Sequence, residues 1–204
     1  RDLVESVHAI QANGMDVMSG FIVGFDSDTP EIFKTQREFI EQAAIPVAMV
    51  GLLTALPETQ LWHRLDQEGR LLGAATGNNA LDVGAMNFVP SMDREVLLTG
   101  YSDLLHDLFT PKAAYGRIKR FLKHFSIPKW VPKRRIILRE FIAFWKLLWA
   151  LGMLSEGRWA FWGLFLHTIF RRPQYLPQVM NLAAMVNHCQ VITRKFIAGQ
   201  KVAV

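Results

Sequence analysis

The order of helix-like and strand-like segments in the first 72 residues is the feature that most constrains the fold. An amphipathic opening helix ends at Asn13-Gly14, a pair typical of a left-handed helix end. Two short apolar runs, 15–25 and 45–57, resemble parallel strands buried on both faces, and a helix-like segment follows each. This alternation predicts right-handed crossovers in a doubly wound sheet or a barrel. Two strands close neither, so we expect further strands before Arg1 and a chain that is a fragment.

The helices after the two runs have clear boundary signals. Thr29 is expected to be the N-cap of the first, Pro30 stands at its first position, and it should end near Ala44. The second, TQLWHRLDQEGRL, is expected to stop at Gly69, because glycine tolerates the left-handed conformation that ends a helix.

The composition then changes to Gly, Ala, Thr and Asn without periodicity. We therefore predict a linker over 73–90, between an α/β part over 1–72 and a helical part over 91–204.

The helical part has its own start signals. Ser91 or Asp93 should cap one helix, and Pro111 should begin another. Prolines and glycines divide the remainder into about three more helices, and no further strand is expected.

Residue types exclude several kinds of site. Cys189 is the sole cysteine, so this chain has no disulfide framework and no cluster or zinc site built from several thiolates; a cytosolic setting is expected. The six histidines lack metal-ligand spacing on any one predicted helix. Tyr101 and Tyr115 are expected to pack with their hydroxyls at the surface and without catalytic roles. No apolar run reaches the roughly 18 residues of a membrane-spanning helix.

Positive charge is concentrated in one stretch. Residues 112–139 hold ten lysines and arginines and no acid, in a chain of net charge +5, which indicates an anionic partner or a solvated face. The segments RRIILREFIAFWKLLWALG and RWAFWGLFLHTIFRRP combine tryptophans, bulky apolar residues and arginines. Helices of this composition are either part of a core or lie on an anionic membrane surface.

Two segments resemble radical SAM proteins that carry a cobalamin-binding domain ahead of the barrel. They are GFIVGFDSDTPEIF and LLTALPETQLWHRLDQEGRL, the second with its proline turn and its Glu68-Gly69-Arg70 end. Glu58 and Gln60 depart from the Pro-Gly-Thr-Pro-Leu turn usual there. The segment from Asn87 onward resembles the tail of a subgroup that includes hopanoid C-2 methylases. The resemblance implies an α/β fold followed by mostly α structure: the C-terminal portion of a radical SAM (partial TIM-like) barrel with an appended helical domain.

The resemblance also implies where the cofactor S-adenosylmethionine would lie. The glycine strand Gly20-x-Ile22-x-Gly24 is similar to a barrel strand whose backbone and apolar side chain line the adenine, since a missing Cβ lets a flat ring approach. Asp26 and Asp28 follow this strand and could bind substrate or the ribose or methionyl part of the cofactor, although turn and cap chemistry also explains them. Close packing is likewise an alternative for the glycines.

The next strand ends in Leu56 and Pro57, which complete the predicted cofactor-binding set.

The activity implied is radical C–H modification, with methylation foremost, of a lipid or natural-product substrate. Such enzymes use a 4Fe-4S cluster, S-adenosylmethionine and cobalamin, and take electrons from a reductant protein such as flavodoxin or ferredoxin. The chain lacks three cysteines at cluster-binding spacing, so alone it should bind neither cluster nor cobalamin and should be inactive.

A cytoplasmic protein, with peripheral contact at the inner face of the membrane, is expected. The alternative is a non-catalytic basic helical module that binds an anionic membrane or nucleic acid. No nucleic-acid recognition motif is present, and no nucleic-acid partner is expected.

Overall fold

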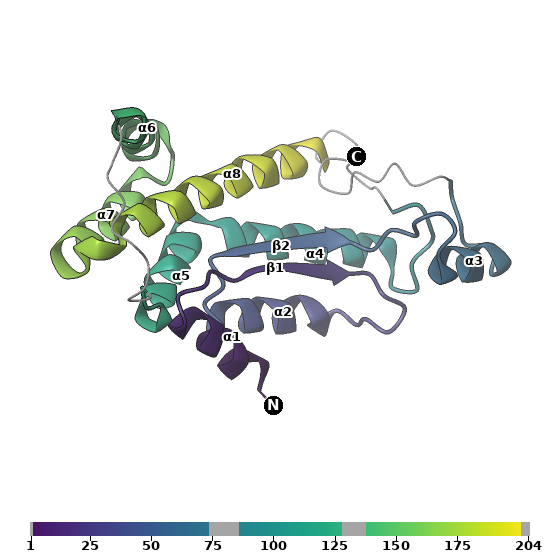
Figure 1. Cartoon of the computed structure of the whole chain (residues 1–204). Coiled ribbons are helices and arrows are strands. Elements are labelled where there is room, and N and C mark those ends of the chain that lie inside the picture. Colours follow the sequence, from purple (N-terminus) through teal and green to yellow (C-terminus); the bar gives the residue numbers. More distant parts are fainter. Residues whose placement is uncertain (1, 74–85, 128–137, 201–204) are drawn as a thin grey trace. The chain divides into compact units, whose positions relative to one another are not determined.

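The computed structural model of the protein describes residues 2–73, 86–127 and 138–200 (Figure 1). The elements follow one another as α1 (Leu3–Ala12), β1 (Met18–Val23), α2 (Glu31–Gln42), β2 (Val47–Leu52), α3 (Gln60–Gln67), α4 (Arg94–Phe109), α5 (Pro111–His124), α6 (Leu138–Trp149), α7 (Arg158–Arg171) and α8 (Leu176–Gln200). A short π-helical segment, Ala150–Leu154, extends α6, and a 3-10 turn, Pro173–Tyr175, precedes α8.

The predicted order of α/β structure followed by helices is confirmed. Strands β1 and β2 form a two-stranded parallel sheet, and the Leu53 amide donates to the Val23 carbonyl at 2.8 Å just beyond the strand ends. Within the described residues after 91, every regular element is helical, and α6, α7 and α8 are the three further helices expected. The barrel itself stays a prediction.

Several helix boundaries were correctly predicted. Thr59 caps α3 by accepting from the Trp62 amide at 3.2 Å, and Gly69 has a φ of +67° beyond the end of that helix. Between the two candidates for the cap of α4, Asp93 is the cap, because its carboxylate accepts from the amides of residues 95 and 96. Helix α5 begins at Pro111 as predicted.

The prediction that the first strand is buried on both faces is wrong for this chain. Exposure alternates along β1, with Met18, Gly20 and Ile22 exposed and Val23 buried. A continuous apolar run predicts a strand that is buried on both faces. In this strand the described residues cover one face only.

The chain forms two compact units that interleave in sequence. The strand unit comprises Gly20–Glu38, Met49–Leu108 and Val191–Val204, and the helical unit comprises Arg1–Ser19, Phe39–Ala48 and Phe109–Gln190. The division into 1–72, 73–90 and 91–204 stays a prediction, and most of its linker lies outside the described residues.

Helices α2 and α4 approach closely within the strand unit. A Cβ placed on Gly100 of α4 would lie 2.2 Å from the ring of Phe33 on α2, so only glycine fits there. Arg37 of α2 pairs with Asp107 of α4 at 2.5 Å. The Tyr101 hydroxyl donates to the Val50 carbonyl of β2 at 3.0 Å, which attaches α4 to the sheet.

The helical unit has an extensive apolar core. Its buried members come mainly from α5, α7 and α8, and include Tyr115, Phe121, Phe161, Leu164 and Val186. The side-chain amide of Gln11 in α1 is buried and donates to the carbonyls of Ala43 and Ala44 at 3.1 and 3.2 Å. Ala44 itself has a φ of +50°, and α2 ends two residues before it, at Gln42, close to the predicted end.

The expectation that both tyrosine hydroxyls reach the surface is wrong. Tyr101 and Tyr115 are 4% and 1% exposed, and burial raises the pKa of each to about 12. Helical spacing among leucines located these side chains in the core, but it did not reveal how deep the hydroxyls lie.

The basic stretch is not a uniform solvated face. Arg117 is fully buried in the helical unit, where its guanidinium donates to Glu41 at 2.5 Å, and burial lowers its pKa to about 10. Arg120 pairs with the other oxygen of the same carboxylate. The acid that neutralises these two arginines comes from α2, far from them in sequence.

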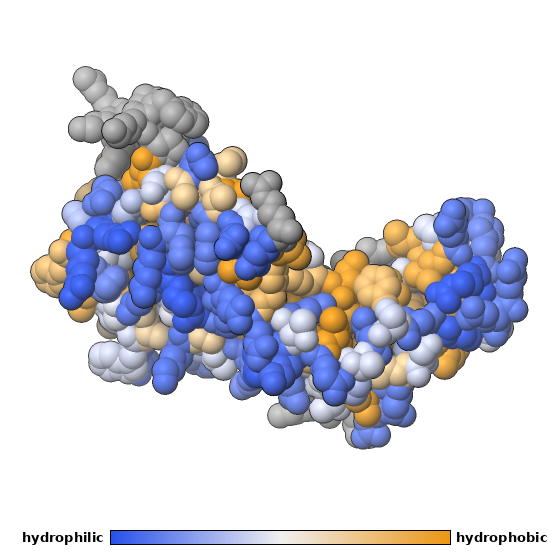
Figure 2. Space-filling view, turned by 90° about the horizontal axis from the view of Figure 1, so that it is seen from below, coloured by the Kyte–Doolittle hydropathy of each residue, from blue (hydrophilic) through white to orange (hydrophobic). Residues whose placement is uncertain are grey.

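Helix α6 buries none of its residues. Phe144, Leu147 and Leu148 are nevertheless partly buried against the core of the helical unit, and Leu151, which follows the helix, belongs to that core. The segment therefore contributes one side to the core and leaves its other side exposed. On the face drawn in Figure 2, hydrophilic side chains cover most of the surface and hydrophobic ones gather in separate patches. Among the described residues, no helix combines the length and apolarity needed to cross a bilayer.

Candidate functional site

The candidate site lies at the carboxyl ends of β1 and β2 in the strand unit. Strand β1 leads into a turn at Gly24, whose φ of +103° favours glycine. The Asp28 carboxylate accepts from the amides of Gly24 and Phe25 at 2.9 and 3.0 Å. Asp28 therefore holds the turn, as the cap alternative predicted.

Asp26 is the centre of an ion-pair network beside this turn. Arg70 and Arg64 each approach one of its oxygens to 2.7 Å, and the Ser91 hydroxyl donates at 2.7 Å. The hydrogen bonds from Arg70 and Ser91, together with Arg64, hold the pKa of Asp26 well below its usual range. The carboxylate is thus charged at neutral pH, and three side chains already contact its two oxygens.

Arg70 connects this network to the segment that precedes α4. Its Nε donates to the Val89 carbonyl and one of its terminal nitrogens donates to Glu68, both at 2.8 Å. An isolated antiparallel bridge joins Leu71 to Phe88 next to it. The Glu-Gly-Arg end of α3 therefore has a structural function.

Asn87 fixes the loop after β2. Its side-chain oxygen accepts from the Ala55 amide at 2.9 Å, and its side-chain nitrogen donates to the Ala55 carbonyl at 2.8 Å. The buried Asn87 side chain thus satisfies both backbone polar groups of Ala55, as a neighbouring strand would.

Leu56 to Thr59 form a tight turn in front of α3. Both the amide and the hydroxyl of Thr59 donate to the Leu56 carbonyl, at 3.3 and 2.7 Å. Pro57 precedes Glu58, which has a φ of +63°. The turn thus has proline at its second position and a left-handed residue at its third, where glycine is preferred.

One face of the sheet is open. Gly20 and Ile22 of β1, and Met49 of β2, are exposed, while Gly51 is partly exposed. A Cβ added to Gly20 or Gly51 would meet no atom within 4 Å. Two neighbouring strands thus present flat backbone flanked by two apolar side chains.

The structure separates the predicted cofactor-binding residues into four groups. Gly20 and Ile22 lie on the open face, while Leu56 and Pro57 are exposed in the turn after β2. Gly24 is buried against Leu97, Met86 and Leu53. Asp26 and Asp28 are engaged in the contacts described above.

Sequence reasoning missed Gly51, Arg70 and Asn87. The motif Glu68-Gly69-Arg70 was a usable signal for Arg70, whereas the roles of Gly51 and Asn87 depend on strand register and on a distant loop. Cys189 is half-buried, and burial raises the pKa of its thiol. The described residues contain no group of three or more His, Cys, Asp and Glu side chains able to hold a metal ion.

Comparison with known proteins places these features in a family. Residues 59–201 match the model of a domain of unknown function, DUF4070. The chain is 32% identical over 204 residues to the hopanoid C-2 methylase of Rhodopseudomonas palustris, covering 97% of this chain and 37% of that protein. It is 30% identical over 187 residues to an uncharacterized methyltransferase of Synechocystis sp., covering 91% of this chain and 35% of that protein.

The chain thus spans little more than a third of the length of either relative. No solved structure is significantly similar to it. The family match covers α3 to α8 and begins at Thr59, the N-cap of α3. The chain therefore belongs to the family of proteins that carry the DUF4070 domain.

Proposed function

We propose that this chain is the C-terminal part of a longer cobalamin-dependent radical SAM methyltransferase that modifies a C–H bond of a lipid or natural-product substrate. The names of the two relatives support methyl transfer, and one of those names, hopanoid C-2 methylase, supports a lipid. The observation that carries the proposal is the open sheet face at Gly20, Ile22, Met49 and Gly51.

The open face suits the adenine of S-adenosylmethionine. Gly20 and Gly51 leave room for a flat ring to approach the backbone, and Ile22 and Met49 offer apolar contact beside it. The turn held by Asp28 follows directly at the carboxyl end of β1. When bound, the cofactor supplies the methyl group and the radical chemistry of the reaction.

The described residues do not fit an iron–sulfur cluster. Cys189 is the chain's sole thiol, whereas a cluster needs several. In this proposal the cluster and the cobalamin are held by other parts of the longer protein. The chain's own residues bind and orient S-adenosylmethionine and exclude water from one side of the site.

The test is cleavage of S-adenosylmethionine by the full-length protein. The protein is produced anaerobically, reconstituted with iron, sulfide and cobalamin, and reduced. Formation of 5′-deoxyadenosine is then measured by chromatography. Formation of 5′-deoxyadenosine is the expected result. A fully loaded cluster without any cleavage would overturn the proposal.

A second function, contact with an anionic membrane surface, is favoured by the surface of α6 and α7. Trp159 and Phe170 are 77% and 81% exposed, and Phe141, Trp145 and Trp149 are also exposed. Large aromatic side chains with arginines nearby are typical of helices that lie at the membrane interface. Flotation with vesicles of neutral and of anionic lipid tests this function. We expect the protein to associate with vesicles only when they contain anionic lipid, and to associate less as the salt concentration rises. Absence of association would exclude this second function.

A further inference from the structure

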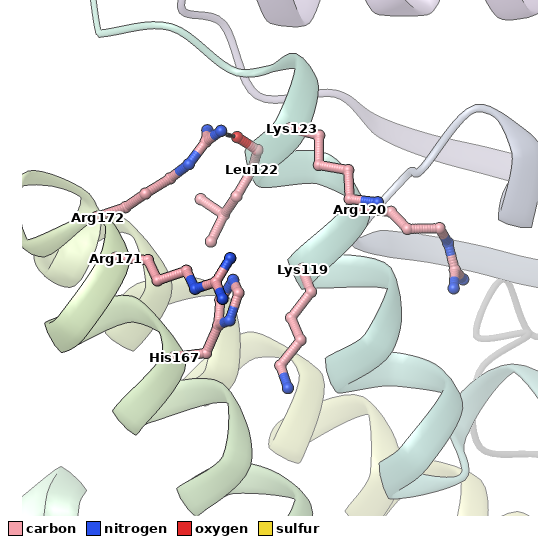
Figure 3. A pocket seen from close by; sticks show the side chains of 7 residues that line it. All are labelled: Lys119, Arg120, Leu122, Lys123, His167, Arg171 and Arg172. Carbon is pink, nitrogen blue, oxygen red and sulfur yellow. Dashed lines mark hydrogen bonds between the residues drawn. The ribbon is translucent and has the colours of Figure 1, made fainter.

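A cationic cavity lies between α5 and α7 in the helical unit and shares no residue with the candidate cofactor site. Its volume is about 430 Å³. Figure 3 shows the seven side chains that line it: Lys119, Arg120, Leu122, Lys123, His167, Arg171 and Arg172. Six of the seven side chains are basic, and none is a carboxylate.

Two of the arginines already have partners. Arg120 points away from the space in Figure 3 and pairs with Glu41. Arg172 donates to the Leu122 carbonyl, and its guanidinium lies 5.8 Å from the centre of the Tyr175 ring. These contacts hold the two guanidinium groups in place at the cavity's margin.

The situation of Lys119, Lys123 and Arg171 is different. Within the part of the chain that the structure describes, Lys119, Lys123 and Arg171 form no ion pair with a carboxylate. In Figure 3, Arg171 lies beside the His167 ring, and Lys119 projects from the facing helix. Like charges held this close repel one another, and an anion placed among them would turn the repulsion into attraction.

The donor set matches a phosphate group better than a carboxylate. Arginine offers two parallel N–H donors to a pair of phosphate oxygens, and lysine adds a mobile point charge. Lys119, Lys123 and Arg171 together exceed what a single carboxylate would neutralise. The burial of His167 and its cationic neighbours lower its pKa, so the ring is mainly neutral at pH 7 and can gain a proton when an anion enters.

We propose that this cavity binds the phosphate or diphosphate group of a ligand, with Lys119, Arg171 and His167 as its principal contacts. The ligand is either a soluble phosphate compound or a lipid whose headgroup bears a phosphate monoester. The proposal is independent of the proposed methyltransferase activity, since no residue is shared between the two sites.

Calorimetric titration of the full-length protein with inorganic diphosphate, in a buffer free of phosphate, tests the soluble ligand. Vesicles of phosphatidylcholine with either phosphatidic acid or phosphatidylglycerol test the lipid ligand, because only phosphatidic acid presents a monoester. Lys119→Gln and Arg171→Gln remove single contacts from the two sides of the cavity. Lys112→Gln is the matched control, since Lys112 is exposed on the same helix outside the cavity.

Either cavity variant is expected to weaken binding about tenfold, whereas Lys112→Gln should change it little. Diphosphate binding with this pattern identifies a soluble ligand, and selective binding to phosphatidic acid with this pattern identifies a headgroup. Arg171→Lys keeps the charge but loses the paired donors, so an intermediate loss is expected. Absence of binding both to diphosphate and to phosphatidic acid vesicles would overturn the proposal. Equal losses of affinity in Lys119→Gln, Arg171→Gln and Lys112→Gln would overturn it as well.

Discussion

The guanidinium of Arg70 donates to the carboxylate of Asp26 at 2.7 Å, and the residue just beyond α3 is thereby bonded to the turn that follows β1. The same side chain donates to the carbonyl of Val89, in the segment before α4. One arginine thus joins three connections of the strand unit. Positions at the carboxyl ends of the strands are kept in place by this network and not by regular secondary structure.

Arg70→Gln is expected to lower the free energy of unfolding by about 2 kcal/mol, because charge-assisted hydrogen bonds are lost and the Val89 carbonyl loses its donor. Urea unfolding measures the change. Arg64→Gln is the control: Arg64 contacts the same carboxylate, but its side chain is 49% exposed, and its removal should cost less than about 1 kcal/mol. Equal losses would show that Arg70 is an ordinary surface arginine.

Glu58→Gly is expected to stabilise the protein by about 0.5 kcal/mol, because Glu58 has a φ of +63° in a turn that favours glycine. The gain is small since glycine also loses more backbone entropy on folding. Thermal unfolding provides the measurement. Glu58→Ala keeps the Cβ and should give no gain. A destabilised glycine variant would mean that the Glu58 side chain matters more than its backbone.

The stacked rings of His8 and His124, 3.8 Å apart in the helical unit, predict a dependence of stability on pH. Burial, His8 and Lys123 lower the pKa of His124 in the folded state. Below about pH 6.5 the unfolded chain therefore binds more protons than the folded chain, and stability falls as the pH decreases through that value. Urea unfolding across this range should show the loss. His124→Phe keeps a stacked ring and should reduce the loss, whereas an unchanged profile would exclude the pair as its source.

The cationic cavity predicts a second pH effect, this time on binding. A bound anion favours the charged form of His167, which lines the cavity. Affinity for sulfate, whose own charge is constant, should therefore rise as the pH falls below about 6.5. Calorimetry at two pH values measures how the affinity for sulfate changes with pH, and His167→Gln should abolish this change. The same change in that variant would assign the effect to another group.

Local signals in the sequence predicted much of the fold. Gly69 and Pro111 act through residues close to them in the chain, and each marks the helix boundary that was expected. The parallel strand pair followed from the helix–strand alternation because few chain paths satisfy it. Burial was less predictable, since the open face of β1 and the depth of the Tyr115 hydroxyl depend on distant segments.

The residues of the candidate sites were likewise predictable from the sequence only in part. Gly20 and Ile22 were selected from the resemblance of the glycine strand, and the structure has both on the same exposed face of β1. Glu41, which neutralises Arg117 and Arg120, could not be connected with them by reading along the chain. The cationic cavity likewise joins α5 to α7, and its basic residues appeared in the sequence as two unrelated charged segments.

The most direct test of the central claim is the rate of 5′-deoxyadenosine formation by the reconstituted full-length protein carrying Gly20→Val. A Cβ added at Gly20 would meet no atom within 4 Å, so the fold should be retained while the valine side chain fills the flat face. Gly73→Val is the control, since its Cβ also meets no atom within 4 Å but lies outside β1. The account predicts a rate lowered about tenfold or more in Gly20→Val and little changed in Gly73→Val, with equal thermal stability. An unchanged rate in Gly20→Val would contradict a role for this sheet face in binding S-adenosylmethionine.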